Sequence, residues 1–284
     1  MQPLKPRLMT CRGRDFLWGT RTFIMGIINM TPDSFAGDGF TTDISSSLDK
    51  AIEFEAMGAD IIDIGAESTR PGHSAVSVDE ELGRLLPAID AILPRVNLPI
   101  SIDTYKPQVA KRALEAGASM VNDVWGVRED TEMLELAASK QIPIVIMHNQ
   151  LKPSYVDPVK DVIASLKATT NMALQCGIEG KNIIIDPGFG FGKTADHNIE
   201  IMRSLFEFKN LPYPLLIGTS RKSTLGLISD VPVNERLEGT IATVALSVAN
   251  GADIVRVHDV REALRASQVA DAIVRNWRPN HWVK

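Results

Sequence analysis

The sequence predicts a (β/α)₈ barrel, the TIM barrel of the α/β class, with a short N-terminal hairpin closing the barrel floor. About eight short apolar runs rich in β-branched residues recur along the 284 residues, and segments with helical spacing lie between them. A doubly wound sheet, which usually has five to seven strands, would leave part of this chain unused. We therefore expect one domain over residues 1–284, with residues 1–21 as an N-terminal extension.

The expected strands are continuously apolar, which is typical of parallel strands that helices and a barrel interior cover on both faces. An antiparallel sheet with one face in water would alternate apolar and polar residues. The eight candidate strands are Thr22–Ile28, Ala59–Gly65, Pro99–Asp103, Ser119–Asp123, Pro143–His148, Asn182–Asp186, Pro214–Gly218 and Asp253–Val257.

Helical spacing near 3.6 residues is clearest between the first two strands, after the third strand and near the C-terminus. Pro107 suits the first turn of the helix that follows the third strand. Four helices are expected to end at a glycine in the left-handed conformation just before the next strand, at Gly58, Gly117, Gly177 and Gly251. At the N-terminus, we expect a hairpin with a turn at Gly19 and Thr20.

Composition excludes several functional classes. Thirty basic and 35 acidic residues give a net charge of −5, which argues against nucleic acid or an anionic membrane as a partner. Only two cysteines occur, without metal-ligand spacing, so a disulfide scaffold or a cysteine-ligated zinc is not expected. The sequence has neither a long apolar run nor a secretory signal, and we expect a cytoplasmic protein.

Polar residues follow all eight expected strands, at the end of the barrel where active sites of this fold lie. A single polar residue at a strand end is commonly a cap or a turn former, but polar residues at every end favour a site. The residues are Asn29, Glu67, Thr69, Arg70, Asp103, Asn122, Asp123, His148, Asp186, Ser220, Arg221, Lys222, Arg256 and His258.

This set predicts an anionic substrate that carries a nitrogen-rich ring. The carboxylates of Asp103 and Asp186 and the amide of Asn122 can bind the donors and acceptors of a heterocycle. Cationic donors suited to phosphate come from Arg70, Lys222, Arg256 and His258. The alternatives are a solvated basic turn at Arg221 and Lys222, and simple turn initiation where Pro187 and Gly188 follow Asp186.

Three loops are rich in glycine or proline and are expected to be mobile lids: those after the first, second and sixth strands. The string GFGFGK in the third loop lacks the spacing of a nucleotide-binding phosphate loop. For His148, a structural role and a ligand-binding role are equally open. His73, His197 and His281 are interpreted as loop or terminal surface residues.

Seven strings of this sequence resemble the dihydropteroate synthase family, in family order and at family spacing. They are MGIINMTPDSF from Met25, DIIDIGAESTRPG from Asp60, ISIDTYKP from Ile100, GASMVNDVWG from Gly117, IIIDPGFGFGKT from Ile183, IGTSRKSTLG from Ile217 and ADIVRVHDV from Ala252. The resemblance implies a transferase of folate biosynthesis, the target of sulfonamides, that joins 6-hydroxymethyl-7,8-dihydropterin diphosphate to p-aminobenzoate with Mg²⁺. It also implies a homodimer formed through the last barrel helices.

The resemblance further implies a role for each matching site residue. The pterin would bind to Asp103, Asn122, Met147, Asp186 and Lys222. The diphosphate would bind to Asn29, which also contacts the magnesium, and to Arg70, Arg256 and His258. The p-aminobenzoate pocket would contain Phe35, Thr69, Pro71, Phe191 and Ser223. Catalysis would depend mainly on Asp103, Asp186, Lys222 and Arg256.

One segment, after the fifth expected strand, departs from the family pattern. After the fifth strand the family usually has Met-His-Met, a basic or polar residue and Gly, whereas this chain has Met147, His148, Asn149 and Gln150.

Two other functions stay open. A corrinoid-dependent methyltetrahydrofolate methyltransferase shares the pterin-binding barrel but does not need the TPDSF, STRPG and SRKS strings. A non-catalytic barrel that binds pterin or serves as a scaffold predicts losses among the site residues, and none is lost here at Asn29, Arg70, Asp186, Lys222 or Arg256.

Overall fold

The computed structural model describes residues 8–30, 44–67, 76–125 and 131–282. Eight parallel strands form one sheet in the order β8-β7-β6-β5-β4-β3-β10-β9, and a parallel bridge between Ile185 and Leu215 joins its two edges. The strands are β3 (Phe23–Asn29), β4 (Ile61–Gly65), β5 (Ile100–Asp103), β6 (Met120–Asp123), β7 (Ile144–Met147), β8 (Ile183–Asp186), β9 (Leu216–Ile217) and β10 (Ile254–Val257). The barrel expected from the sequence is therefore confirmed, and its strands match the eight apolar runs.

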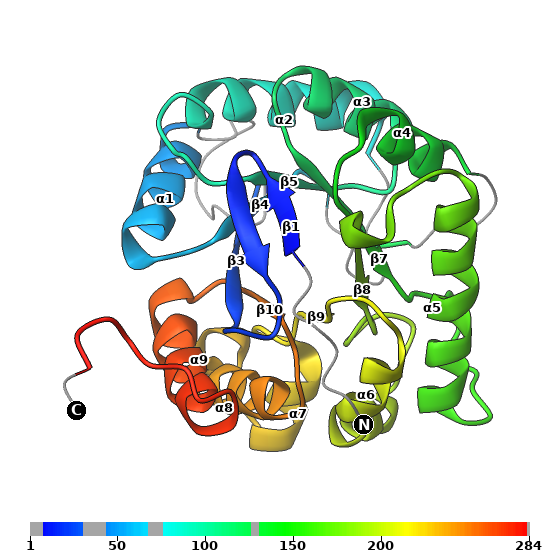
Figure 1. Cartoon of the computed structure of the whole chain (residues 1–284), viewed down its shortest axis with the longest axis vertical. Helices are drawn as coiled ribbons and strands as arrows, with labels where there is room; N and C mark the ends of the chain where they lie inside the picture. Colours follow the sequence, from blue (N-terminus) through cyan, green and yellow to red (C-terminus); the bar gives the residue numbers. More distant parts are fainter. Residues whose placement is uncertain (1–7, 31–43, 68–75, 126–130, 283–284) are drawn as a thin grey trace.

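Helices surround this sheet on the outside, as Figure 1 shows. They are α1 (Ile44–Met57), α2 (Val78–Ile92), α3 (Pro107–Glu115), α4 (Glu132–Lys140), α5 (Pro158–Gln175), α6 (Ala195–Arg203), α7 (Ser223–Ser229), α8 (Leu237–Ala249) and α9 (Val260–Val274), with short 3₁₀ turns η2 (Gly180–Asn182), η3 (Leu205–Asn210) and η4 (Val233–Glu235). The four glycines expected after helices all have positive φ, between 93° and 109°. None of the helices in these described ranges is long and apolar enough to cross a membrane.

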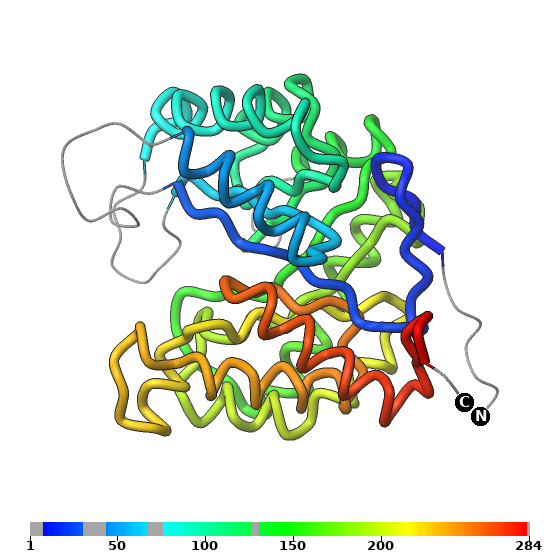
Figure 2. Tube along the Cα trace, turned by 90° about the vertical axis from the view of Figure 1, so that its left-hand side faces the viewer, coloured from blue at the N-terminus to red at the C-terminus, as the bar shows by residue number. Residues whose placement is uncertain are grey.

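The N-terminal hairpin lies at one end of the barrel (Figure 2). It consists of β1 (Leu8–Cys11) and β2 (Arg14–Leu17), paired in antiparallel register. Its turn is at Arg12 and Gly13, with φ of 46° and 72°, and not at Gly19 and Thr20 as the sequence suggested. Positive φ at both central residues matches the strand twist of a two-residue hairpin, whereas the Gly19 turn leads from β2 into β3.

The core has two parts, one on each face of the barrel wall. The larger part lies between strands and helices and includes Phe54, Leu85 and Leu134. The smaller part fills the barrel at the hairpin end. There Phe16 and Trp18 stack on each other, and both rings pack at an angle against Phe23 of the first barrel strand. Aromatic rings provide the large apolar area that such a plug needs. The hairpin therefore closes the floor, as expected.

The floor also sets which side chains line the interior above it. Strand side chains alternate between faces, so the residue two positions after an inward floor residue also points inward. Ile61, Met120, Ile184 and Ile254 belong to the floor cluster. The residues two positions further on are Asp63, Asn122, Asp186 and Arg256. An apolar floor thus carries a polar layer directly above it, toward the carboxyl ends of the strands.

Candidate active site

The polar layer brings together five charged or amide side chains from different strands, all of them interior. Asp63, Asp103, Asn122 and Asp186 are each less than a tenth exposed, and the Arg256 side chain is only slightly more so. In the sheet, Asp103 lies beside Asn122, and Met147 lies beside Asp186. The sequence separation of these residues is large, and the barrel is what makes them neighbours.

Arg256 connects the carboxylates of this layer. Its Nε donates to Oδ2 of Asp63 and its second terminal nitrogen donates to Oδ2 of Asp103, both at 2.6 Å. The same Asp63 oxygen accepts a bond of 3.1 Å from the amide of Asn122. Burial opposes the guanidinium charge, but Asp63 and Asp103 outweigh it, so the pKa of Arg256 is raised further above its usual range.

Asp103 keeps one oxygen available for a ligand. Its Oδ1 atom is buried and has no hydrogen-bond partner among the residues that the structure describes. Burial, opposed by Arg256 and assisted by the charge of Asp63, raises the pKa of Asp103 to about 7. A buried carboxylate oxygen without a partner is costly, so a ligand that offers an N–H donor would be bound favourably there.

Asp186 contributes a further buried carboxyl group to the site. Burial raises the pKa of this carboxyl to about 6, although the Gly188 N–H and Lys222 stabilise its charge. The Gly188 bond to Oδ1 measures 2.7 Å. Lys222, at the start of α7, lies with its Nζ 3.8 Å from the centre of the Phe191 ring, in a cation–π contact. The positive charge of Lys222 thus acts on the Asp186 carboxylate at this side of the site.

His258 lies next to this site but does not supply the positive charge that the sequence suggested. Its Nδ1 is 2.9 Å from the hydroxyl of Ser220, and that hydroxyl accepts the His258 backbone N–H. Burial, together with the charges of Arg256 and Arg221, lowers the pKa of His258 to about 3. The ring is therefore neutral near pH 7 and can contact an anion only as a hydrogen-bond donor.

Some of the remaining expected residues lie at the carboxyl ends of the strands, and the others lie outside the described ranges. Asn29 ends β3 and is half-buried, and Ser223 is exposed at the first turn of α7. Met147 is buried at the end of β7. The residues of the first two loops lie outside the described part of the chain: Phe35, Thr69, Arg70 and Pro71, together with His73.

Asp63 is the site residue that the sequence analysis missed. It lies in the middle of a strand, two residues before Gly65, whereas the predicted site residues all lie at strand ends. A carboxylate inside an otherwise apolar β-branched run was the available signal, since an ionised group is rarely buried without a partner. Alternation from Ile61 would have placed it inside the barrel with Asp103.

The loop after β8 is packed, which differs from the mobile lid that its glycines suggested. Lys193 binds carbonyl oxygens of the loop, and Tyr155 donates to the Gly192 carbonyl at 2.9 Å. His148 is buried and in contact with Lys193, which supports the structural alternative for it. His197 is partly exposed, as expected, but it lies in the capping box of α6 and not in a loop, and His281 is exposed.

The comparisons with known proteins agree with this geometry. A family model described as pterin binding enzyme matches residues 25–258. The dihydropteroate synthase of Clostridium beijerinckii is 47% identical over 268 residues, covering 94% of this chain and all of that protein.

Two solved structures from Xanthomonas albilineans are similar along nearly their whole length. Dihydropteroate synthase with 4-aminobenzoic acid is 38% identical, with a TM-score of 0.89 over 95% of this chain and 98% of that one. The enzyme in complex with 7,8-dihydropteroate is 37% identical, with a TM-score of 0.86 over 94% and 98%. The chain therefore belongs to the pterin-binding enzyme family, in its dihydropteroate synthase branch.

Proposed function

We propose that this chain is a dihydropteroate synthase that joins 6-hydroxymethyl-7,8-dihydropterin diphosphate to p-aminobenzoate. The observation that carries the proposal is the polar layer, in which Asp103 Oδ1 is buried without a partner beside Asn122 and Asp186. A pterin presents an amino group and ring N–H groups on one edge, and carboxylates accept such donors in pairs. The relatives named dihydropteroate synthase support the same reaction.

The chemistry follows from the charges around the layer. The amine nitrogen of p-aminobenzoate attacks the exocyclic methylene of the pterin, a C–N bond forms, the C–O bond to diphosphate breaks, and the amine loses a proton. An aromatic amine is already a free base near pH 7, so no general base needs to activate it. As diphosphate leaves, positive charge develops on the methylene and ring, which the carboxylates of Asp103 and Asp186 would stabilise.

The residue roles are part of the proposal. The pterin contacts are assigned to Asp103, Asn122, Met147, Asp186 and Lys222. The diphosphate contacts are assigned to Asn29, Arg70, Arg256 and His258, the last as a neutral donor. The p-aminobenzoate contacts are assigned to Phe35, Thr69, Pro71, Phe191 and Ser223. The buried positions of Asp103, Asn122 and Asp186 and the exposed position of Ser223 favour an order in which the pterin binds first.

Mg²⁺ is proposed as the cofactor, with Asn29 as its protein ligand. Within the described ranges there is no cluster of three acidic, His or Cys side chains to hold a metal alone. Mg²⁺ commonly keeps several waters and binds through one or two protein oxygens together with substrate phosphates, so a single amide oxygen at the end of β3 fits. When bound, the ion would neutralise charge on the departing diphosphate.

A cytoplasmic homodimer is also proposed, formed by the faces of α8 and α9. Leu246 on α8 and Ile273 on α9 are 57% and 77% exposed, and Val269 lies on the same helix as Ile273 at 63%. The two helices are neighbours in the barrel wall (Figure 1). Exposed apolar side chains that gather on adjacent helices are typical of a subunit interface.

The test is a pair of assays on the purified protein. With pterin diphosphate and Mg²⁺, release of diphosphate should require p-aminobenzoate, and dihydropteroate should accumulate. With methyltetrahydrofolate and a corrinoid protein, no methyl transfer is expected. Methyl transfer, or the absence of both activities, would contradict the proposal and favour the methyltransferase or a non-catalytic barrel.

A further inference from the structure

A lysine at the end of the 187–194 loop is bound entirely by neutral acceptors. Lys193 Nζ donates to the carbonyl oxygens of Gly188 and Phe191, each at 3.0 Å, and lies 3.0 Å from Nδ1 of His148. The His148 carbonyl is a more distant acceptor at 3.4 Å. In the part of the chain that is described, no carboxylate lies within ion-pair distance of Lys193, although the charge of Asp186 acts on it from further away. The ammonium of Lys193 thus binds backbone carbonyls and a neutral ring nitrogen, in place of a counter-ion.

His148 has the protonation state that this contact needs. Burial and the nearby Lys193 charge lower the pKa of His148 to about 3, so its ring is neutral and Nδ1 can accept. Burial also lowers the pKa of Lys193 to about 7. A buried ammonium that has backbone carbonyls and a neutral ring as its bonded partners, and no ion pair, is expected to have a purpose in the geometry of the loop.

The loop is also closely fitted to the segment after β7. A Cβ atom on Gly188 would lie 1.9 Å from the His148 carbonyl oxygen, and one on Gly192 would lie 2.2 Å from that of Gln150. Both glycines also have positive φ, so a side chain at either position is disfavoured by the clash and by the backbone conformation. The segment that departs from the family pattern is therefore the surface on which this loop rests.

The 187–194 loop contributes residues to one side of the active site. Phe191, whose carbonyl binds Lys193, places its ring 3.8 Å from Lys222 Nζ. Gly188, whose carbonyl also binds Lys193, donates its N–H to Asp186. One ammonium thus restrains two residues that touch the proposed pterin and p-aminobenzoate sites.

We propose that Lys193 is a positioning residue that holds Phe191 over Lys222 and so shapes the p-aminobenzoate pocket. The inference rests on the proposed function, because it names the substrate whose binding Lys193 controls. It predicts that the charge of Lys193 acts on catalysis through Phe191 and not through contact with either substrate.

A double-mutant cycle tests this inference. Lys193→Met, which keeps the chain length and removes the donors, should raise KM for p-aminobenzoate by about 10- to 100-fold, as for a small displacement of a substrate-binding group. Binding of pterin diphosphate alone should change less than the KM for p-aminobenzoate, because Asp103 and Asn122 lie on other strands and Lys193 acts on Asp186 only through Gly188. Phe191→Ala with Lys193→Met should be no worse than Phe191→Ala alone. Additive effects would overturn the inference.

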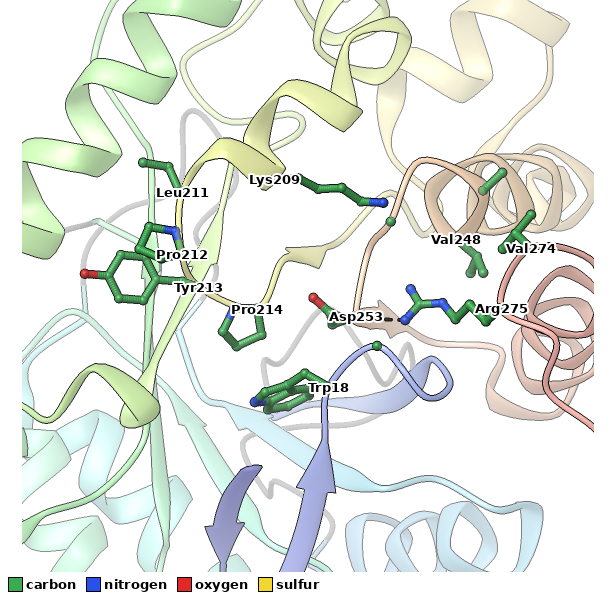
Figure 3. Close-up of a pocket in the computed structure, with 13 residues that line it drawn as sticks. Trp18, Lys209, Leu211, Pro212, Tyr213, Pro214, Val248, Asp253, Val274 and Arg275 are labelled. Carbon is green, nitrogen blue, oxygen red and sulfur yellow. Dashed lines mark hydrogen bonds and ion pairs between the residues drawn. The ribbon is translucent and has the colours of Figure 1, made fainter. Parts of the chain in front are cut away.

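A chemical rescue of the Lys193 side chain and a matched control variant distinguish a positioning role of Lys193 from a general effect on stability. Lys193→Cys in a Cys176→Ser background, alkylated to an aminoethyl side chain, should recover most of the lost affinity for p-aminobenzoate. The control is Lys209→Met at the opposite end of the barrel, in the hollow of about 300 Å³ between Trp18, Pro214 and Asp253 (Figure 3). That variant should match the wild-type protein in both KM values, and an equal effect at both lysines would contradict a role for Lys193.

A second variant decides the matter if Lys193→Met does not fold. Tyr155→Phe removes only the 2.9 Å bond to the Gly192 carbonyl and should raise KM for p-aminobenzoate by about threefold. An unchanged KM in this variant overturns the inference. The proposed function fails separately, if the wild-type protein itself makes no dihydropteroate.

Discussion

Replacing Asp63 tests how the polar layer is held together. Asp63 is fully buried and accepts bonds from Arg256 at 2.6 Å and from Asn122 at 3.1 Å. Asp63→Ala leaves the buried guanidinium with Asp103 as its remaining carboxylate and leaves the Asn122 amide without this acceptor. Removing one partner of a buried ion pair costs about 3–5 kcal/mol, which corresponds to a fall in Tm of roughly 5–8 °C for a chain of this size.

Asp63→Asn separates the charge from the geometry. An amide oxygen can still accept from both donors. The bond from the Asn122 amide then changes from a charge-assisted one of about 1.5–3 kcal/mol to a neutral one of about 0.5–1.5 kcal/mol, while the bond from Arg256 keeps the guanidinium charge. The loss of about 1 kcal/mol should lower kcat/KM for pterin diphosphate roughly fivefold, with a much smaller change in Tm. Because the charge of Asp63 raises the pKa of Asp103, the acid limb of the pH profile should move to lower pH.

The assays are thermal unfolding and kcat/KM for pterin diphosphate across pH, with Ser101→Ala as a control at the position beside Asp63 in the next strand. If Asp63→Ala melts like the wild-type protein and keeps its kcat/KM, the carboxylate does not hold Arg256 and Asn122, and the reasoning is refuted. If Asp63→Asn moves the acid limb to higher pH, the assigned repulsion between the two carboxylates is wrong.

Three further predictions concern pH, one cation and assembly. Because the ionised form of Asp103 accepts the pterin donors and its pKa is about 7, kcat/KM measured at pH 6 should be about 11-fold below its plateau, and a flat profile would contradict this assignment. Lys222→Ala should lower kcat/KM by about 10- to 150-fold, the loss of one charge-assisted contact, with Tm nearly unchanged; an active variant would exclude the contact. Ile273→Glu should convert the proposed dimer to a monomer in sedimentation, whereas Leu174→Glu, on an exposed apolar position of α5, should not.

The fold was readable from the sequence because its signals are local. Eight apolar runs, helical spacing between them and glycines such as Gly58 and Gly117 each depend on a few neighbouring residues, and all reappear in the structure. The hairpin turn was misplaced because two turns occur within residues 8–22, and only the register of Cys11 with Arg14 shows which one joins paired strands.

The site was only partly readable because its decisive features are non-local. Strand ends identified Asp103, Asn122 and Asp186, but the bond from Arg256 to Asp63 joins residues 193 positions apart. No sequence spacing encodes that contact. The neutral state of His258 likewise depends on burial and on charges that include those of Arg221 and Lys50, which are distant in the sequence.

The loop after β8 shows the same limit. Its glycines suggested mobility, since glycine permits many conformations, but the structure uses Gly188 and Gly192 for close approach to the chain after β7. A glycine pattern alone does not distinguish an open loop from one that must fit against a backbone. The contacts of Lys193 are what decide between them.

The most direct measurement is a single-turnover reaction that counts both products. Enzyme in excess over pterin diphosphate, with p-aminobenzoate and Mg²⁺, should yield dihydropteroate and diphosphate in equal amounts, and Asp103→Asn should slow both together. Dihydropteroate formed at the wild-type rate by Asp103→Asn, or diphosphate released without dihydropteroate, would contradict a pterin site built on the polar layer above the barrel floor.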